Sequence, residues 1–229
     1  MTLGANDKRY NEQMSAQYLS PTLQQQLSEI STQGFSVTDE FIGSAHILAL
    51  AAEINTLEAN AQMHIANTGR VPSPINTKLR GDSIYWLDET DASPAQQAYF
   101  EKMEALRSAL NQHLYLGLLT LESHLALYPI GSGYQKHLDR FQDKDHALSP
   151  QRQISCILYL NQDWLAEDGG CLRLHLNHNM STELEAGDNY LDIAPLAGRL
   201  VVFLSDTFYH EVLAATRVRK SLTAWFLSR

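Results

Sequence analysis

The residues in this chain whose types and spacing could carry out chemistry are His137, Asp139 and His210. On a β-strand, residues i and i+2 point to the same face, so His137-Leu138-Asp139 would present an imidazole and a carboxylate together. Two histidines and one carboxylate are the ligands that hold a non-haem Fe(II) ion. His210, which follows the apolar run Leu200–Leu204, is the candidate for the third ligand. Because short His-x-Asp patterns also occur in surface turns, the spacing by itself only indicates a metal centre.

A predicted strand after His210 adds a second chemical group. Its residues would alternate between two faces, one of which carries Arg219, Ser221, Thr223 and Trp225. The other face would carry Lys220, Leu222 and Ala224. A buried guanidinium is costly unless it is paired, and a dicarboxylate could pair with it through two hydrogen bonds. The pattern therefore indicates an anion-binding strand near the metal ligands.

The first half of the chain predicts three helices that would support these residues. One begins at Ser20-Pro21 and ends at Gly34, a second is capped by Ser44, and a third begins at Ser93-Pro94. Each has an apolar stripe at helical spacing: Leu23, Leu27 and Ile30; Ile47, Leu48, Ala51, Ile54 and Leu57; Tyr99, Met103, Leu106 and Leu110. The segment Asn60–Lys78 has no periodicity, and loops of that length usually serve as lids or binding loops.

The second half predicts short strands separated by turns, after an earlier strand at Ser83–Leu87. The apolar runs are His124–Tyr128, Ile154–Leu160, Cys171–Leu176, Leu200–Leu204 and Leu222–Leu227. Regular short strands of this kind are typical of an antiparallel barrel or jelly roll. We therefore expect one α+β domain over 1–229, with a loose polar arm over about 1–20 and helical support with a substrate loop over 21–118. The catalytic core over 119–229 would be a jelly roll.

Composition restricts the class of protein and of partner. Hydrophobic residues make up 44% and charged residues 19%, as in a globular domain. The net charge of −9 argues against a nucleic-acid or anionic-membrane partner. No apolar run approaches the roughly 20 residues of a membrane helix, and the polar N-terminus predicts no secretory signal. The two cysteines lack metal-site spacing, which favours a reduced, cytoplasmic setting, and the absence of heptads favours a monomer.

Longer motifs occur in a recognisable order along nearly the whole chain, from about residue 25 to 227. They are Leu79–Trp86, Tyr128-Pro129 with Gly131–Tyr134, His137–Asp139, Ile157–Trp164, Gly169–Arg173, His210–Val212 and Arg219–Trp225. In this order and spacing the chain resembles the Fe(II)- and 2-oxoglutarate-dependent oxygenases. It is most similar to the prolyl hydroxylases of the hypoxia-inducible-factor type and their bacterial counterparts. The resemblance implies a double-stranded β-helix, the cupin-like form of the jelly roll.

The resemblance also implies roles for individual residues. His137, Asp139 and His210 would bind iron, and Arg219 would bind the C5 carboxylate of 2-oxoglutarate. Further cosubstrate contacts would come from Tyr159, Thr223, Tyr128 and Leu172. Substrate contacts would come from Arg152, Trp225 and Arg80, and the Asn60–Arg80 loop would close over a target peptide.

One cosubstrate residue has an alternative. Collagen-type prolyl hydroxylases place a lysine against 2-oxoglutarate one position further along the strand, where this chain has Lys220. Adjacent strand residues face opposite ways, so only one of Arg219 and Lys220 can point inward. The shared face with Thr223 and Trp225 favours Arg219.

The implied activity is hydroxylation of a C–H bond coupled to conversion of 2-oxoglutarate and O2 to succinate and CO2, with ascorbate as a stimulant. The expected substrate is a proline in a protein or peptide, with elongation factor Tu as the specific hypothesis. The alternatives are hydroxylation of a free amino acid or small molecule, and a non-catalytic cupin-like binding protein. A nucleic-acid demethylase is disfavoured by the negative charge and by Trp225, which stands where those enzymes carry a further arginine.

Overall fold

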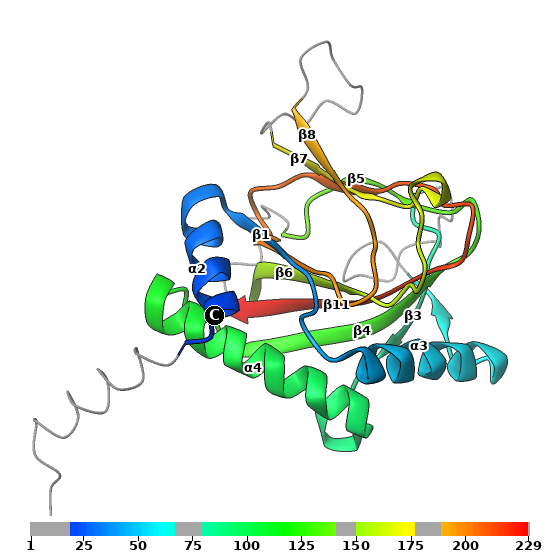
Figure 1. Cartoon of the computed structure of the whole chain (residues 1–229), viewed down its shortest axis with the longest axis horizontal. Coiled ribbons are helices and arrows are strands. Elements are labelled where there is room, and N and C mark those ends of the chain that lie inside the picture. The colour runs from blue at the N-terminus through cyan, green and yellow to red at the C-terminus, as the bar shows by residue number, and fades with distance from the viewer. Residues whose placement is uncertain (1–18, 67–78, 141–149, 177–188, 229) are drawn as a thin grey trace, which may run out of the picture.

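Two antiparallel sheets backed by three helices form the framework of the protein (Figure 1). The computed structural model describes residues 19–66, 79–140, 150–176 and 189–228. The larger sheet has the order β1 (Phe35–Thr38), β9 (Leu200–Leu204), β6 (Gln151–Tyr159), β11 (Arg219–Ser228), β4 (Thr120–Tyr128), β3 (Ser83–Trp86) and β2 (His64–Ile65). The smaller sheet has the order β5 (Tyr134–His137), β10 (His210–Val212), β7 (Leu172–His175) and β8 (Tyr190–Ile193). This arrangement confirms the predicted double-stranded β-helix core with supporting helices.

The helices α2 (Pro21–Gln33), α3 (Ser44–Ala59) and α4 (Pro94–Leu114) lie together against one side of the larger sheet (Figure 1). Two short 3₁₀ turns, η1 (Glu89–Asp91) and η3 (Ala166–Asp168), complete the described elements. The main apolar core fills the space between helices and sheet. Its helical members include Leu27, Ile30, Ile47, Leu50, Ile54, Tyr99, Met103, Leu106 and Leu110. Its sheet members include Leu125, Ile154, Leu158, Leu222 and Phe226. The helices therefore stabilise the outer face of the sheet and leave its inner face for other roles.

Two of the predicted helix starts are confirmed by their capping bonds. The Ser20 hydroxyl accepts a hydrogen bond from the Leu23 amide at 3.2 Å, and Ser93 accepts one from the Gln96 amide at 3.2 Å. Gly34 ends α2 in the left-handed conformation with φ of 82°, which a residue without a Cβ adopts at little cost.

The prediction for α3 was wrong in two details. The helix begins at Ser44 itself, with Gly43 at the N-cap and no side-chain capping bond. Leu50 is buried in place of Leu48, which is 53% exposed. The residues around Ile47 are apolar on every side of the helix, so the pattern could not identify the buried face.

The predicted strands of the second half correspond to β4, β6, β7, β9 and β11. The short strands β8 and β10 were not predicted, and of β5 only its last residue, His137, fell within a predicted strand. The segment expected to be a loop after Asn60 contains β2, which pairs with β3. The rest of that loop, residues 67–78, and the expected arm up to residue 18 lie outside the described residues.

The strand β11 shows the predicted alternation. Leu222, Ala224 and Phe226 join the core beneath the helices. Arg219, Ser221, Thr223 and Trp225 face the cavity between the two sheets. In Figure 1, β11 is the red strand that runs beside the green β4, and these two strands pair along nearly their whole length. A single strand therefore supplies both the structural core and the candidate site.

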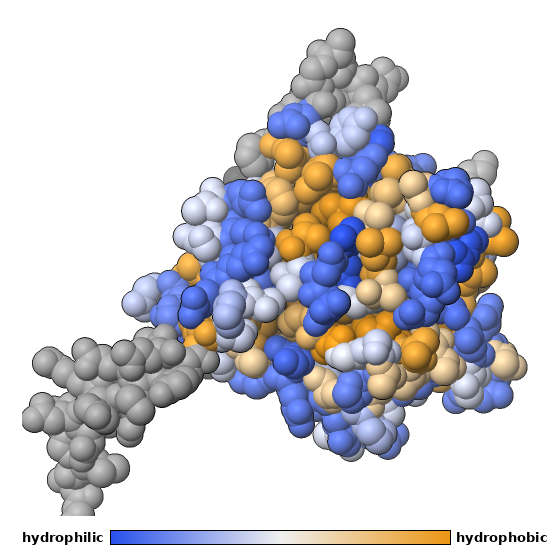
Figure 2. Space-filling model, viewed as in Figure 1, coloured by the Kyte–Doolittle hydropathy of each residue, from blue (hydrophilic) through white to orange (hydrophobic). Residues whose placement is uncertain are grey.

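The outward surface of α2 carries mainly hydrophilic side chains in Figure 2, as expected of a helix whose apolar stripe faces the sheet. Among the described residues, no helix combines the length and the apolar character needed to cross a membrane.

Candidate active site

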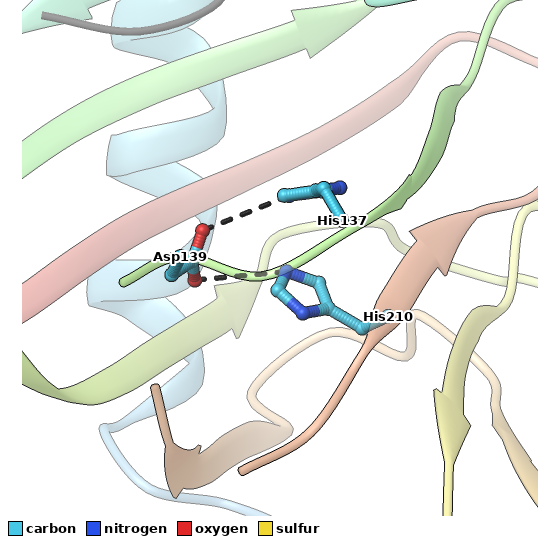
Figure 3. Close-up of side chains that lie close together, drawn as sticks. All are labelled: His137, Asp139 and His210. Atoms are coloured by element: carbon cyan, nitrogen blue, oxygen red, sulfur yellow. Dashed lines mark ion pairs between the residues drawn. The ribbon is translucent and has the colours of Figure 1, made fainter. Parts of the chain in front are cut away.

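The side chains of His137, Asp139 and His210 converge between the two sheets (Figure 3). One donor atom from each residue lies within 4.8 Å of the other two. His137 ends β5 and His210 begins β10, and these two residues are direct partners in the smaller sheet. Asp139 lies in a bend after β5, so the expected strand running through Asp139 is wrong. Its carboxylate still reaches both imidazoles, with 3.6 Å from each oxygen to one Nε2 atom.

Backbone carbonyl groups orient both imidazoles. Nδ1 of His137 lies 2.7 Å from the Gln135 carbonyl oxygen, and Nδ1 of His210 lies 3.2 Å from that of Phe208. A carbonyl can only accept a hydrogen bond, so Nδ1 donates in each case and Nε2 keeps its lone pair for a metal ion. The orientation therefore fits a metal at the point where the two Nε2 atoms meet the carboxylate.

Aromatic rings hold the same two histidines in place. The ring of Tyr134 stacks on His137 with a centroid distance of 3.6 Å, and Phe203 meets His210 edge to face at 4.8 Å. These contacts limit rotation of the imidazoles about their side-chain bonds. Protein contacts therefore orient both imidazoles.

The electrostatic state of the three residues also suits a divalent cation. Burial, together with the nearby His137, lowers the pKa of His210 to about 4. Burial alone would raise the pKa of Asp139, but the neighbouring His210 and His137 and the Ser155 hydroxyl hold that pKa well below its usual value. Near neutral pH the site therefore offers one carboxylate and a neutral His210, the protonation states in which these groups bind metals. Two imidazoles and one carboxylate match the Fe(II) site of non-haem oxygenases.

A cavity of about 490 Å³ extends from the three ligands along the inner face of the larger sheet. Arg219 lines this cavity and is 1% exposed. Its Nε donates a hydrogen bond to the Gly170 carbonyl oxygen at 3.0 Å. The rings of Tyr128 and Tyr159 flank it, with centroids 5.1 and 5.0 Å from Cζ. A positive charge is therefore held in a largely aromatic recess.

Three buried polar atoms around this recess have no hydrogen-bond partner among the described residues. They are Nη2 of Arg219, the hydroxyl of Tyr159 and Oγ of Ser221. Buried polar groups in folded proteins are almost always hydrogen-bonded, so these atoms indicate a ligand rich in acceptor oxygens. A carboxylate would satisfy them and neutralise Arg219. The recess therefore fits one end of a dicarboxylate such as 2-oxoglutarate.

Lys220 lies on the opposite face of β11. Its ammonium group contacts the side-chain oxygen of Asn55 on α3, away from the cavity. Thr223 and Tyr128 line the cavity. Leu172 and Tyr159 are buried in the apolar cluster between the two sheets, and the Tyr159 ring also flanks Arg219.

The three predicted substrate residues lie around the other parts of the same cavity. The guanidinium of Arg152 stacks over Trp225, with Cζ 3.4 Å from the ring centroid. Arg80 forms two hydrogen bonds to Asp82, of 2.7 and 2.9 Å, and its Cζ lies 5.0 Å from the Tyr134 ring centroid. Arg152, Trp225 and Arg80 thus form a polar and aromatic wall.

Two residues near the site, His124 and Ser155, were not predicted from the sequence. His124 is buried in the cavity wall between Trp86 and Trp225, with ring centroids 4.9 and 5.3 Å away. Ser155 donates a hydrogen bond to Asp139 at 2.6 Å. The available signal was strand alternation, because Ser155 stands between the core residues Ile154 and Cys156 and must face the other way.

Comparisons with known proteins agree with this geometry. Residues 123–227 match the 2OG-Fe(II) oxygenase superfamily. The crystal structure of a Pseudomonas putida prolyl-4-hydroxylase is 39% identical in sequence, with a TM-score of 0.78 over 90% of this chain and 100% of that one. A prolyl hydroxylase from Trichoplax adhaerens, solved with a hypoxia inducible factor peptide, is 22% identical and shares the fold with a TM-score of 0.74, over 99% of this chain and 94% of that one.

Two of the curated relatives are much longer proteins. The hypoxia-inducible factor prolyl hydroxylase of Caenorhabditis elegans is 30% identical over 86% of this chain and 27% of its own length. Egl nine homolog 1 of Homo sapiens is 26% identical over 86% of this chain and 44% of its own length. The chain thus spans less than half of each of these two relatives.

Proposed function

The chain belongs to the prolyl hydroxylase group of the 2-oxoglutarate- and Fe(II)-dependent oxygenases, and from this premise we propose that it is a protein prolyl 4-hydroxylase. The observation that carries the proposal is the shared cavity. It is lined by His137, Asp139 and His210 and also by Arg219, whose Nη2 has no hydrogen-bond partner among the described residues. Iron and 2-oxoglutarate supply the oxidising chemistry, which consumes O2 and yields succinate and CO2.

The protein's own residues position the reactants. His137, Asp139 and His210 would hold Fe(II) on one side and leave its other positions open to the cavity. Arg219 would bind the distal carboxylate of 2-oxoglutarate through charge-assisted hydrogen bonds, with Tyr159 contributing its buried hydroxyl. Thr223 and Tyr128 would form the adjacent wall, and Leu172 would support that wall from behind.

The peptide would approach along the wall of Arg152, Trp225 and Arg80. Trp86 is half exposed beside this wall and offers an apolar surface to a proline ring. Closing a site with such side chains excludes water from the reacting C–H bond. We expect the Asn60–Arg80 segment to contribute to that closure.

As the specific substrate we propose a proline in a switch loop of elongation factor Tu, following the resemblance to bacterial prolyl hydroxylases. The free thiols of Cys156 and Cys171 are consistent with action in the cytoplasm. We also propose that the enzyme acts as a monomer and that ascorbate raises its turnover.

The first experiment measures 2-oxoglutarate decarboxylation by anaerobically iron-loaded protein after O2 is admitted. Proline peptides, free proline and elongation factor Tu would be compared, with Asp139→Ala as the control. We expect peptide-stimulated succinate formation that is lost in the control, and a mass gain of one oxygen atom on a proline of elongation factor Tu. Stimulation by free proline alone would instead assign a small-molecule hydroxylase, and binding of iron and 2-oxoglutarate with no turnover would indicate a binding protein.

A further inference from the structure

The position of Asp139 is not set by the sheet that carries the two histidines. The strand β5 ends at His137, so no ladder hydrogen bond of that strand reaches Asp139. The side chain of an aspartate in a bend can rotate, and either of its two oxygens could then face the metal site. Other groups must therefore fix the orientation of Asp139.

Two buried serines of the larger sheet contact this carboxylate in series. Ser155 on β6 lies in the row of Trp225 and Phe203, on the inner face of the sheet. Its hydroxyl donates to Oδ2 of Asp139 at 2.6 Å. The hydroxyl of Ser205, just after β9, lies 2.8 Å from that of Ser155. Both serines are 0% exposed, so water does not compete for these bonds.

Each serine has a single hydroxyl proton, and this determines which serine donates the hydrogen bond between them. Ser155 has one hydroxyl proton, which it donates to Asp139. The bond between the serines must then run from Ser205 to the oxygen of Ser155. A hydroxyl that accepts a hydrogen bond becomes a stronger donor, so Ser205 strengthens the bond that Ser155 makes.

Ser205 also holds the backbone beside Asp139. Its carbonyl oxygen accepts a hydrogen bond from the Arg140 amide at 3.3 Å. The Arg140 side chain extends this attachment through Gln153, at 3.1 Å, and Asp206, at 3.0 Å. The bend that carries Asp139 is therefore fastened to β6 and to the end of β9, which belong to the larger sheet.

We propose that Ser155 and Ser205 are positioning residues of the metal centre: Ser155 binds Oδ2 of Asp139, Ser205 acts through Ser155, and the pair orients the carboxylate toward the metal. The proposal rests on the proposed function, since it assigns these serines to the same metal site. Side chains that hydrogen-bond to metal ligands typically change metal affinity 10- to 100-fold when they are replaced. A search of the sequence for metal ligands would not select either serine. Their effect on the metal would be indirect, through the carboxylate of Asp139.

The test is Mn(II) affinity of the full chain without peptide, measured by electron paramagnetic resonance of the free ion. We expect Ser155→Ala to weaken Mn(II) binding about 10-fold or more, and Ser205→Ala to weaken it less. Because Ser205 acts through Ser155, the double variant should bind about as weakly as Ser155→Ala alone. The control is Ser123→Ala, which removes another buried hydroxyl, 3.3 Å from Tyr99 and on β4.

A second pair of variants separates the hydroxyl group from packing. Ser155→Thr and Ser155→Val have nearly the same shape, and only threonine keeps the donor. The Ser155→Thr variant should bind Mn(II) about 10-fold more tightly than the Ser155→Val variant. Equal affinities for this pair, or wild-type affinity in Ser155→Ala, would overturn the assignment and leave the proposed function intact. If the unmodified protein binds no Mn(II) or Fe(II), both proposals are wrong.

Discussion

Arg219 and Lys220 are neighbours in β11 that face opposite sides of the larger sheet. Arg219 lines the cavity that also contains His137, Asp139 and His210, whereas Lys220 contacts Asn55 on α3. From the sequence, either cation could be assigned as the residue that binds 2-oxoglutarate. Their orientation distinguishes them: of the two, Arg219 lines the cavity and has a buried nitrogen with no hydrogen-bond partner among the described residues.

Replacing Arg219 by alanine should weaken 2-oxoglutarate binding about 100-fold, since losing one partner of a buried charge pair costs about 2–5 kcal/mol. Lys220→Ala is the matched control and should bind 2-oxoglutarate within about twofold of the wild type. Calorimetric titration with 2-oxoglutarate in the presence of Mn(II) measures both. A larger effect at Lys220 than at Arg219 would reverse the assignment.

Metal should stabilise the folded protein through His137, Asp139 and His210. A ligand that binds only the native state at 100 times its dissociation constant adds about 2.7 kcal/mol. We expect Mn(II) to raise the melting temperature of the wild type and a chelator to reverse the rise. His210→Ala and Asp139→Ala should show no shift, and an equal shift in these variants would place the metal elsewhere.

His124 should make stability depend on pH. Burial lowers its pKa to about 3, and the charges of Arg80 and Arg152 act in the same direction. Between the usual histidine pKa near 6.5 and this value, the unfolded chain binds a proton that the folded protein does not. Stability is therefore fully present above about pH 6.5 and is lost as the pH falls toward 3. In this window a single proton contributes up to about 1.4 kcal/mol per pH unit.

The measurement is urea unfolding of the wild type and of His124→Gln from pH 7 down to the lowest pH at which both fold. We expect the variant to lose stability less steeply on acidification. Replacement of the exposed His113 on α4 by glutamine is the control, because it removes a histidine without touching the cavity. Parallel curves for the wild type and His124→Gln would show that His124 contributes nothing to acid sensitivity.

Gly133 should be essential for the contact between β5 and β10. A Cβ at this position would overlap the Val212 carbonyl oxygen of β10. Gly133→Ala must therefore separate the strands that carry His137 and His210, and we expect a loss of about 1–3 kcal/mol in unfolding free energy. Mn(II) affinity should fall in the same variant. Gly43→Ala, where the new atom meets only an ordinary contact at 3.6 Å, should cost about 1 kcal/mol or less.

Much of the inner face of the larger sheet could be predicted from the sequence, since strand alternation is strict. The period of two correctly separated Arg219 and Trp225 from Leu222 and Ala224. The same rule would have placed Ser155 on the cavity side, but a serine attracts no attention until its neighbour Asp139 is known. Long elements with one clear period were therefore predictable, including their inner residues.

Two errors came from local features that periodicity cannot resolve. In α3, apolar residues occur on all sides, so tertiary packing and not pattern chose Leu50 over Leu48. The spacing of His137 and Asp139 suggested that one strand carries both, but β5 ends at His137. The convergence of Asp139 with His210 depends on contacts between the two sheets, which no local pattern contains.

The place of β11 in the larger sheet has a consequence for how the protein is made. Among the described strands β11 comes last in the sequence, yet it lies between β4 and β6 and pairs with both. During synthesis, the facing edges of β4 and β6 stay open until the ribosome has delivered this strand. Open edges of apolar strands invite pairing with other chains. Nascent chains stalled before Arg219 would therefore depend on chaperones, and they would lack the buried guanidinium between Tyr128 and Tyr159.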